Sequence, residues 1–315
     1  MMMMNARQAA IERARACFLR ACWLDVAVRK PGNVSQASPG HGMQASMFIA
    51  SAEAAAGALF APGLRVGARI EAAVAATWAV AGCNTNLGIL LLCAPIALAL
   101  EQHPHAGTPA ALRAAVESVL ATLDIDDARA AYRAIARAHP GGLGTAPAED
   151  VRDAPSVDLR AAMALAADRD LIARQYRDGF ADLFALAFQA PVHPAGWGEA
   201  PASADAPPDA ATVAYVQRLY LACLGAFPDS HIVRKHGERV AQTVMTAAQA
   251  WRERADAGVA LDADPGFAAW DLSLKAAGVN PGTSADFTVA ALLLSGWIRS
   301  CAAPAREAAN GWHGS

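Results

Sequence analysis

The chain has 315 residues, of which 55% are hydrophobic and 17% charged, and its formal net charge is −3. The apolar fraction is ample for a close-packed core and excludes a disordered chain. Because there is no global basic field, we expect neither nucleic acid nor an anionic membrane as a partner. Any anion site must therefore be local.

The cysteines and the apolar runs indicate a reducing, aqueous environment. None of the six cysteines forms a C-x-x-C pair, and most lie among apolar residues, which favours buried thiols over zinc ligands or disulfides. The longest apolar run, 87–100, contains Pro95 and is too short to span a bilayer. The N-terminal region, with Arg7 and Glu12, does not resemble a secretory signal. We therefore expect a cytoplasmic protein with no membrane segment.

The pattern of apolar residues predicts helices throughout. Alanine-rich segments repeat apolar residues at i, i+3, i+4 and i+7, and no run of alternating β-branched residues interrupts them. The fold class is therefore predicted to be all-α. The expected helices cover about 5–29, 44–60, 69–81, 87–102, 109–122, 125–138, 158–189, 210–226, 237–257, 264–277 and 284–302.

These helices are predicted to form one compact domain over residues 1–303, with polar interhelical loops that converge on a central cleft. The proline- and alanine-rich segment 189–210 predicts an exposed loop, and 304–315 a frayed tail. The proline-rich segment could instead separate two domains. Similar polar clusters on both sides of it favour a single one.

Lysine is scarce, and two of the three lysines fall in polar clusters. Arginine supplies almost all of the positive charge, and the lysines are Lys30, Lys235 and Lys275. Lys30 begins a rigid Pro-Gly turn that continues to Asn33, with His41 downstream. Such a turn can present a cation and an amide to phosphate or carboxylate oxygens, although Lys30 could equally complement a helix dipole.

Two further clusters are rich in amides or glycine. Asn84 and Asn86 lie between two very apolar stretches, either as ordinary helix caps or as amides at the bottom of a cleft. The segment 141–144 is Gly-Gly-Leu-Gly and predicts a flexible loop. Glu149 and Asp150 beyond it are metal ligands only if this loop folds back onto the other clusters.

The remaining two clusters carry mixed chemistry. Asp229, His231, Arg234 and Lys235 place a carboxylate, an imidazole and two cations between two predicted helices, a density that favours a site over a solvated turn. The segment 280–286 opens the last apolar helix. Its Ser284 and Asp286 could cap that helix, bind an anion at its free N–H groups, or hold magnesium through Asp286.

Taken in order, these clusters resemble the triphosphoribosyl-dephospho-CoA synthase family over roughly residues 15–300. The resemblance implies an all-helical transferase that moves the triphosphoribosyl group of ATP to dephospho-CoA and releases adenine. It also implies that the product is the prosthetic-group precursor of an acyl carrier subunit.

Individual positions agree with the family pattern only in part. The T-P-K-P-G-L-V-D motif is matched at Lys30, but Ser35 stands in place of its carboxylate. In the N-T-H-K-G turn the His and Lys are Asn86 and Leu87. The resulting N-T-N-L-G is more similar to a divergent branch associated with tetrahydromethanopterin and methylofuran genes, so the acceptor could differ.

The resemblance also implies roles for individual residues. Cleaving the ribose–adenine bond calls for a triphosphate clamp formed by Mg²⁺ and cations, an acid for the departing base and a base for the incoming hydroxyl. The sequence leaves open a nucleotide-using enzyme of one-carbon cofactor biosynthesis, a non-catalytic helical binding subunit, and a homo-oligomeric state. The implied residues are His41, Asp229 and His231 for catalysis, Asp229 and Asp286 for Mg²⁺, and Lys30, Asn33, Asn84, Asn86, Arg234, Lys235 and Ser284 for ATP and a coenzyme-like acceptor.

Overall fold

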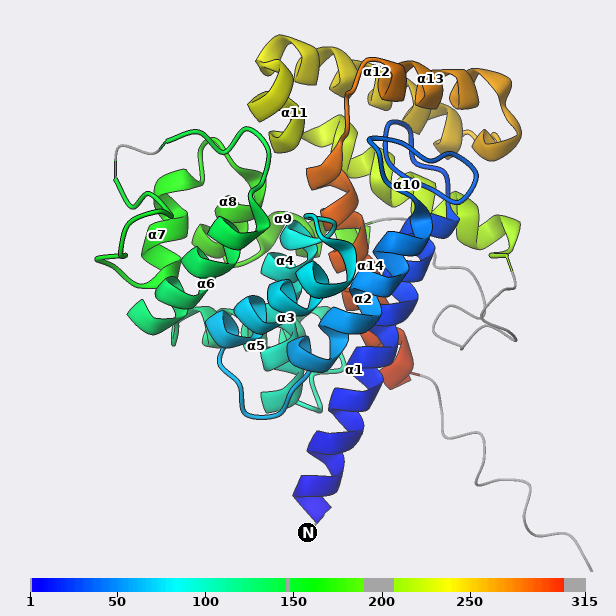
Figure 1. Cartoon of the computed structure of the whole chain (residues 1–315). Helices are drawn as coiled ribbons and strands as arrows, with labels where there is room; N and C mark the ends of the chain where they lie inside the picture. The colour runs from blue at the N-terminus through cyan, green and yellow to red at the C-terminus, as the bar shows by residue number, and fades with distance from the viewer. Residues whose placement is uncertain (1, 146–147, 190–206, 303–315) are drawn as a thin grey trace, which may run out of the picture.

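The computed structural model describes residues 2–145, 148–189 and 207–302 (Figure 1). Its regular structure within these ranges is helical, with two isolated bridges, Ser35–Ser38 and Gly40–Met43, in one loop. The all-α prediction is confirmed. In chain order the helices are α1 (Met2–Ala27), α2 (Ala45–Leu59), α3 (Val66–Ala81), α4 (Leu87–Gln102), α5 (Pro109–Leu120), α6 (Ile125–Ala138), α7 (Leu159–Ala166), α8 (Leu171–Arg177), α9 (Ala181–Gln189), α10 (Ala210–Ala226), α11 (Ser230–His236), α12 (Glu238–Asp256), α13 (Pro265–Ala276) and α14 (Gly282–Ala302).

Helices α4 and α14 form the centre of the molecule. Both are apolar on nearly every face, and α14 packs against α1, α4, α9 and α10. The larger buried apolar cluster surrounds these two helices, and a smaller one joins α10 to α12 and α13. Figure 1 shows α11–α13 at one end of the molecule and α6–α8 at one side. The starts of α4 and α14 therefore lie between these outer groups.

The prediction of one helix over 158–189 is wrong, because the structure divides this stretch into α7, α8 and α9. The first break lies between α7 and α8. The Asp170 carboxylate accepts hydrogen bonds from the N–H groups of Ile172 and Ala173 and so caps the start of α8. Gly179, with φ of +62°, and Phe180, with φ of +57°, separate α8 from α9. The apolar spacing continues through both breaks.

A second difference is the short helix α11, where the sequence predicted an interhelical turn. Asp229 has an extended backbone and accepts from the N–H groups of His231 and Ile232, which makes it the N-cap of this helix. Gly237, with φ of +85°, ends α11 and leads into α12. The polar cluster is thereby placed on a rigid turn of helix.

Part of the predicted domain lies outside the described residues. Residues 190–206 of the predicted exposed loop, and the tail 304–315, lie outside the described residues. The division into a single domain over 1–303 stays a prediction. All six cysteines are free. Within the described ranges, no individual helix combines the length and hydropathy needed to cross a membrane, and only α10 with α11, bent by 54°, meets that test as a pair.

Candidate active site

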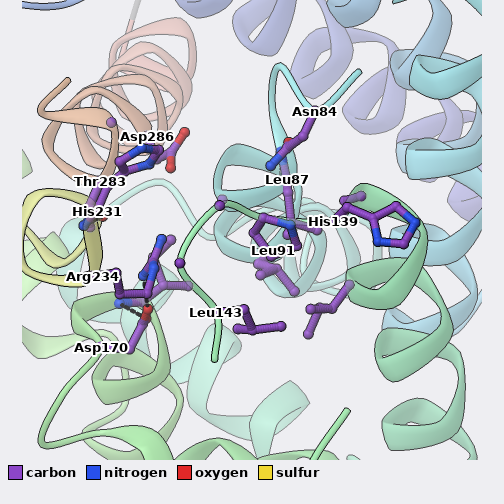
Figure 2. Close-up of a pocket in the computed structure, with 18 of the residues that line it drawn as sticks. Asn84, Leu87, Leu91, His139, Leu143, Asp170, His231, Arg234, Thr283 and Asp286 are labelled. Carbon is purple, nitrogen blue, oxygen red and sulfur yellow. Dashed lines mark hydrogen bonds and ion pairs between the residues drawn. The ribbon is translucent and has the colours of Figure 1, made fainter. Parts of the chain in front are cut away.

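The five polar clusters meet at a cavity of about 760 Å³ (Figure 2). Its wall is formed by the 31–43 loop, the turn before α4, the ends of α3 and α6, α7, α8, α11 and the start of α14. The predicted convergence of interhelical segments on a central cleft therefore agrees with the structure. Of the residues predicted from sequence, those that line it are Asn33, His41, Asn84, Asn86, His231, Arg234, Lys235 and Asp286.

Lys30 lies behind the cavity wall rather than in it. Its side chain is fully buried, and its Nζ donates to the Asp25 carbonyl oxygen at 2.6 Å and to Asn33 Oδ1 at 2.8 Å. The same Nζ lies 3.0 Å from Asp25 Oδ1 and 5.8 Å from the centroid of the Tyr220 ring. All three donor directions of the ammonium are used within the protein, so Lys30 is placed to hold the wall and not to contact a phosphate.

Asp25, at the end of α1, is a cavity residue that sequence reasoning missed. It is 3% exposed, and burial raises the pKa of its carboxyl group, opposed by the charge of Lys30. Its sequence neighbours Leu24 and Val26 are apolar and fully buried, so the local pattern indicates a helix in the core and not a binding site. The available signal was an acid on a helix five residues before a rare lysine.

Asp229 and Ser284 join α11 to α14 and do not line the cavity. Asp229 Oδ1 accepts from two N–H groups of α11, and its Oδ2 accepts from the Ser284 N–H and Oγ–H, each at 2.8 Å. Both oxygens are committed to these contacts, and Asp229 is 1% exposed. This arrangement fixes the cavity residues of α11 against those of α14.

His231 projects from α11 into the cavity wall. Its Nε2 is buried and has no hydrogen-bond partner among the described residues. Burial, together with Arg234 and Lys235, lowers its pKa from the ordinary 6.5 to about 3. The imidazole is therefore neutral at physiological pH, with a ring nitrogen able to exchange a proton.

The low pKa of His231 predicts a contribution to acid sensitivity. The unfolded chain binds a proton at this residue below its ordinary pKa of 6.5, whereas the folded chain does so only near 3, so acidification through that window favours unfolding. Between pH 6.5 and 4, the unfolding free energy of His231→Gln is expected to fall less than that of the parent. Urea denaturation at each pH measures both values. His105→Gln, at an exposed position, is the control. Equal acid sensitivity of the parent and His231→Gln would contradict this.

Arg234 and Lys235 are the cations of α11 beside His231. Arg234 Nη1 pairs with Asp170 Oδ2 at 2.7 Å, while its Nε is buried without a partner. Lys235 is exposed and forms no ion pair with any described residue. The 141–144 loop folds back onto them: a Cβ on Gly141 would lie 2.6 Å from Lys235 Cε, and one on Gly142 2.9 Å from the Arg234 carbonyl oxygen. The loop therefore closes one side of the cationic region.

Asp286, on the first turns of α14, faces the cavity beside His231 and Thr283 (Figure 2). Burial raises the pKa of its carboxyl group well above the usual range, and the carboxylates of Asp25 and Asp229 raise it further. No described residue gives it a hydrogen bond or an ion pair that would compensate a negative charge. A protein-bound cation or a proton is the natural partner for such a group.

The approach of α4 to Asp286 depends on a glycine. A Cβ on Gly88 would lie 2.0 Å from Asp286 Oδ2 and 2.7 Å from Ile172 Cδ1. We expect Gly88→Ala to displace the carboxylate and to lower the transfer rate at least about a hundredfold, with a stability loss of about 1–3 kcal/mol. Gly57→Ala in α2, where nothing lies within 4 Å of the added carbon, is the matched control and should retain activity. Rates and urea midpoints of both variants test this. Full activity of Gly88→Ala would contradict it.

The turn before α4 supplies amides to the same cavity. Asn84 Oδ1 caps the helix by accepting from the Leu87 N–H at 3.1 Å. Asn86 is 6% exposed and its amide makes no such cap, so it is free to contact a ligand. Leu87 also lines the cavity, where the resemblance expects a lysine.

The 31–43 loop carries the first cluster. Lys275, on α13, donates to the Ser38 carbonyl oxygen and to Ser38 Oγ and pairs with Asp271, which in turn accepts from the Gly32 N–H. His41 Nε2 lies 2.8 Å from the Gly32 carbonyl oxygen and so donates to it, which leaves Nδ1 as an acceptor. Lys275 therefore has a structural role in shaping this loop.

The cavity carboxylates determine whether the wall suits Mg²⁺. Among the described residues, no group of three or more His, Cys, Asp and Glu is arranged to hold a metal ion. Glu149 accepts from Ser156, and Asp150 pairs with Arg152, so the acidic pair after the glycine loop is engaged locally. Asp25 and Asp286 are two cavity carboxylates whose buried charges oppose each other. Because Mg²⁺ in nucleotide enzymes commonly takes one or two carboxylates, substrate phosphates and waters, these two residues fit it.

Comparison with protein-family models gives one match over almost the whole chain. The model described as ATP:dephospho-CoA triphosphoribosyl transferase matches residues 11–301. The chain belongs to this family. The resemblance inferred from the motifs is therefore confirmed, and so is the expectation of a transferase. ATP as a substrate fits this family.

A solved structure supports the fold independently. A protein from Archaeoglobus fulgidus, provisionally assigned as a triphosphoribosyl-dephospho-CoA synthase, is similar to this family member with a TM-score of 0.58 and 22% sequence identity. The match covers 78% of the present chain and 97% of the other. A search of curated protein sequences gives no match.

Proposed function

We propose that this transferase moves the triphosphoribosyl group of ATP onto a hydroxyl group of dephospho-CoA, with release of adenine. The observation that carries the proposal is one cavity in which the cations Arg234 and Lys235 stand beside the buried carboxyl group of Asp286. The cations suit a polyphosphate, and the carboxyl group suits either its Mg²⁺ or the charge that develops on the ribose.

The binding part of the cycle uses the residues of α11 and the turn before α4. Lys235 and the unpaired Nε of Arg234 contact phosphate oxygens, and Asn86 contacts the ribose hydroxyls or the acceptor. Asp25 and Asp286 would hold Mg²⁺. When bound, this ion offsets phosphate charge and orients the triphosphate.

The transfer step breaks one bond and forms one bond. The acceptor hydroxyl oxygen attacks C1′ of the ATP ribose, the bond from C1′ to the adenine N9 breaks, and its electron pair leaves with the base. His231 Nε2 takes the hydroxyl proton and passes it to solvent, and the departing adenine takes one proton from solvent, so that the imidazole ends the cycle neutral and the protons balance. Bound triphosphate offsets the charges of Arg234 and Lys235 that lower the His231 pKa, which makes the nitrogen more basic when substrate is present. His41 Nδ1 is the second acceptor on the wall.

The experiment is an assay of adenine release by the purified protein with ATP and Mg²⁺, run with dephospho-CoA and without any acceptor. We expect adenine and a triphosphoribosylated dephospho-CoA in equal amounts. Adenine with no modified dephospho-CoA would reject this acceptor. No adenine at enzyme concentrations comparable to ATP would reject the transfer itself.

Asn86 and Leu87 favour a second candidate acceptor. Both line the cavity where the resemblance expects His and Lys, so one cation is missing from the wall. The second candidate therefore keeps ATP as donor and uses a less anionic acceptor from one-carbon cofactor biosynthesis, of the tetrahydromethanopterin or methylofuran type. Accumulation of a precursor of such a cofactor in a deletion strain, with no change in acyl carrier maturation, would favour it.

A further inference from the structure

The cavity has two chemically different ends. Figure 2 shows His231, Arg234 and Asp286 on one side, His139 on the opposite side, and Leu87 and Leu91 between them. Among the described lining residues, the lysine and arginine side chains come from the segment after α7 and from α11, and none comes from α3 or α6. The far end therefore offers no cation to a phosphate. Trp78, whose ring contacts His139, belongs to this far end, and the apolar side chains of Ile135, Leu143, Met163 and Leu165 also line the cavity.

The acids near this far end are already engaged. Glu149 Oε2 accepts from the Tyr132 hydroxyl at 3.1 Å, and Asp150 Oδ2 pairs with Arg152 at 2.7 Å. Neither carboxylate is left to select a cation. A neutral group is consequently the ligand that this end suits.

An aromatic surface is open at this end. The rings of Trp78 and His139 lie 6.2 Å apart between centroids, edge to face at 63°. Trp78 is partly exposed and lines the cavity, so part of its indole surface faces the cavity, where a planar ring can pack against it.

Two leucines of the cavity wall are unusually exposed. Leu165 on α7 is 57% exposed and Leu143 in the glycine loop is 44% exposed, and both line the cavity. Gly142 and Gly144, with φ of +75° and +66°, flank Leu143, and Gly142 is pressed against the Arg234 carbonyl oxygen. The loop that borders the cationic end thus also places an apolar side chain on the cavity wall (Figure 2).

We propose that the far end of the cavity is a subsite for the purine ring of the nucleotide donor, which stacks on Trp78 and is flanked by Leu143 and Leu165. The proposal rests on the proposed function in taking ATP as the owner of that ring. The ring lies at the end without cations, the triphosphate lies at Arg234 and Lys235, and the ribose bridges Leu87 and Asn86. Adenine leaves from the apolar end once its bond to C1′ breaks.

The test separates the two ends with three probes: adenosine, inorganic tripolyphosphate and ATP, each titrated by calorimetry. Trp78→Ala is expected to weaken adenosine and ATP about tenfold and to leave tripolyphosphate unchanged. Lys235→Ala is expected to weaken tripolyphosphate and ATP and to leave adenosine unchanged. Trp78→Phe retains a ring and should keep most of the adenosine affinity.

Two variants guard against a loss of folding. Leu165→Asn changes an exposed side chain and should weaken adenosine two- to threefold without altering the urea midpoint. Trp270→Ala, in the Trp251 cluster away from the cavity, should bind all three probes normally. Adenosine affinity unchanged in both Trp78→Ala and Leu165→Asn, or no adenosine binding by the parent, overturns the subsite. Adenosine binding that depends on Trp78, without any adenine release from ATP, instead refutes the proposed function and leaves the subsite standing.

Discussion

Replacing Lys30 by Met is expected to destabilise the fold by about 3–5 kcal/mol, because it leaves the buried Asp25 carboxylate without its counter-ion. The substitution also removes the hydrogen bonds that the Lys30 ammonium donates to the Asp25 carbonyl oxygen and to Asn33. Urea denaturation at neutral pH measures the change. The effect is expected to be larger than that of any single cavity substitution, since Lys30 holds the wall together.

The control for this prediction removes both charges. The double variant Lys30→Met with Asp25→Asn should recover at least half of the lost stability, since the orphaned carboxylate is gone. Its transfer activity should stay low, because Asp25 is a proposed Mg²⁺ ligand. A loss below about 1 kcal/mol for Lys30→Met alone would show that the ion pair does not support the wall.

The substitution Asp286→Asn is expected to abolish transfer and at the same time to stabilise the protein. Activity should fall at least about a hundredfold, because the neutral amide can neither hold Mg²⁺ nor balance charge on the ribose. Stability should rise, because the folded protein binds the Asp286 proton more tightly than the unfolded chain does. The unfolding free energy of the parent therefore falls as pH rises above the ordinary carboxyl pKa of 3.8 towards the raised one.

This fall with pH should be smaller in Asp286→Asn than in the parent when both are measured in a metal chelator. A variant that loses activity and stability together would indicate a structural role for Asp286. A variant that keeps full transfer activity would show that the reaction does not need the Asp286 carboxylate.

The sequence predicts the fold class and most of the helices because apolar spacing is a local property. The predicted and observed bounds agree for α4, α6 and α10. The prediction of one helix over 158–189 failed because the apolar period continues through both breaks. Asp170 caps a new helix, and Gly179 has a left-handed backbone that ends one. The dipeptide Asp178-Gly179 was the available signal.

The sequence predicted which segments form the site, but not which of their side chains face the cavity. Lys30 and Asp229 lie in the turns that the sequence predicted for the site. Lys30 is buried behind the wall, however, and both carboxylate oxygens of Asp229 accept hydrogen bonds within the protein, so neither side chain lines the cavity. Asp25 was missed because it sits in a helix among core residues, and its importance depends on the distant Asp286. Which side of a turn faces a ligand is set by tertiary packing, which spacing along the chain does not encode.

Single-turnover adenine release tests most directly whether the chemistry takes place in this cavity. With enzyme in excess over ATP, and with Mg²⁺ and dephospho-CoA present, the parent should release one adenine per ATP, and Asp286→Asn should release none on that time scale. Gly57→Ala should behave as the parent. Equal release by the parent and Asp286→Asn, or no release by the parent, would contradict the assignment of this cavity as the active site.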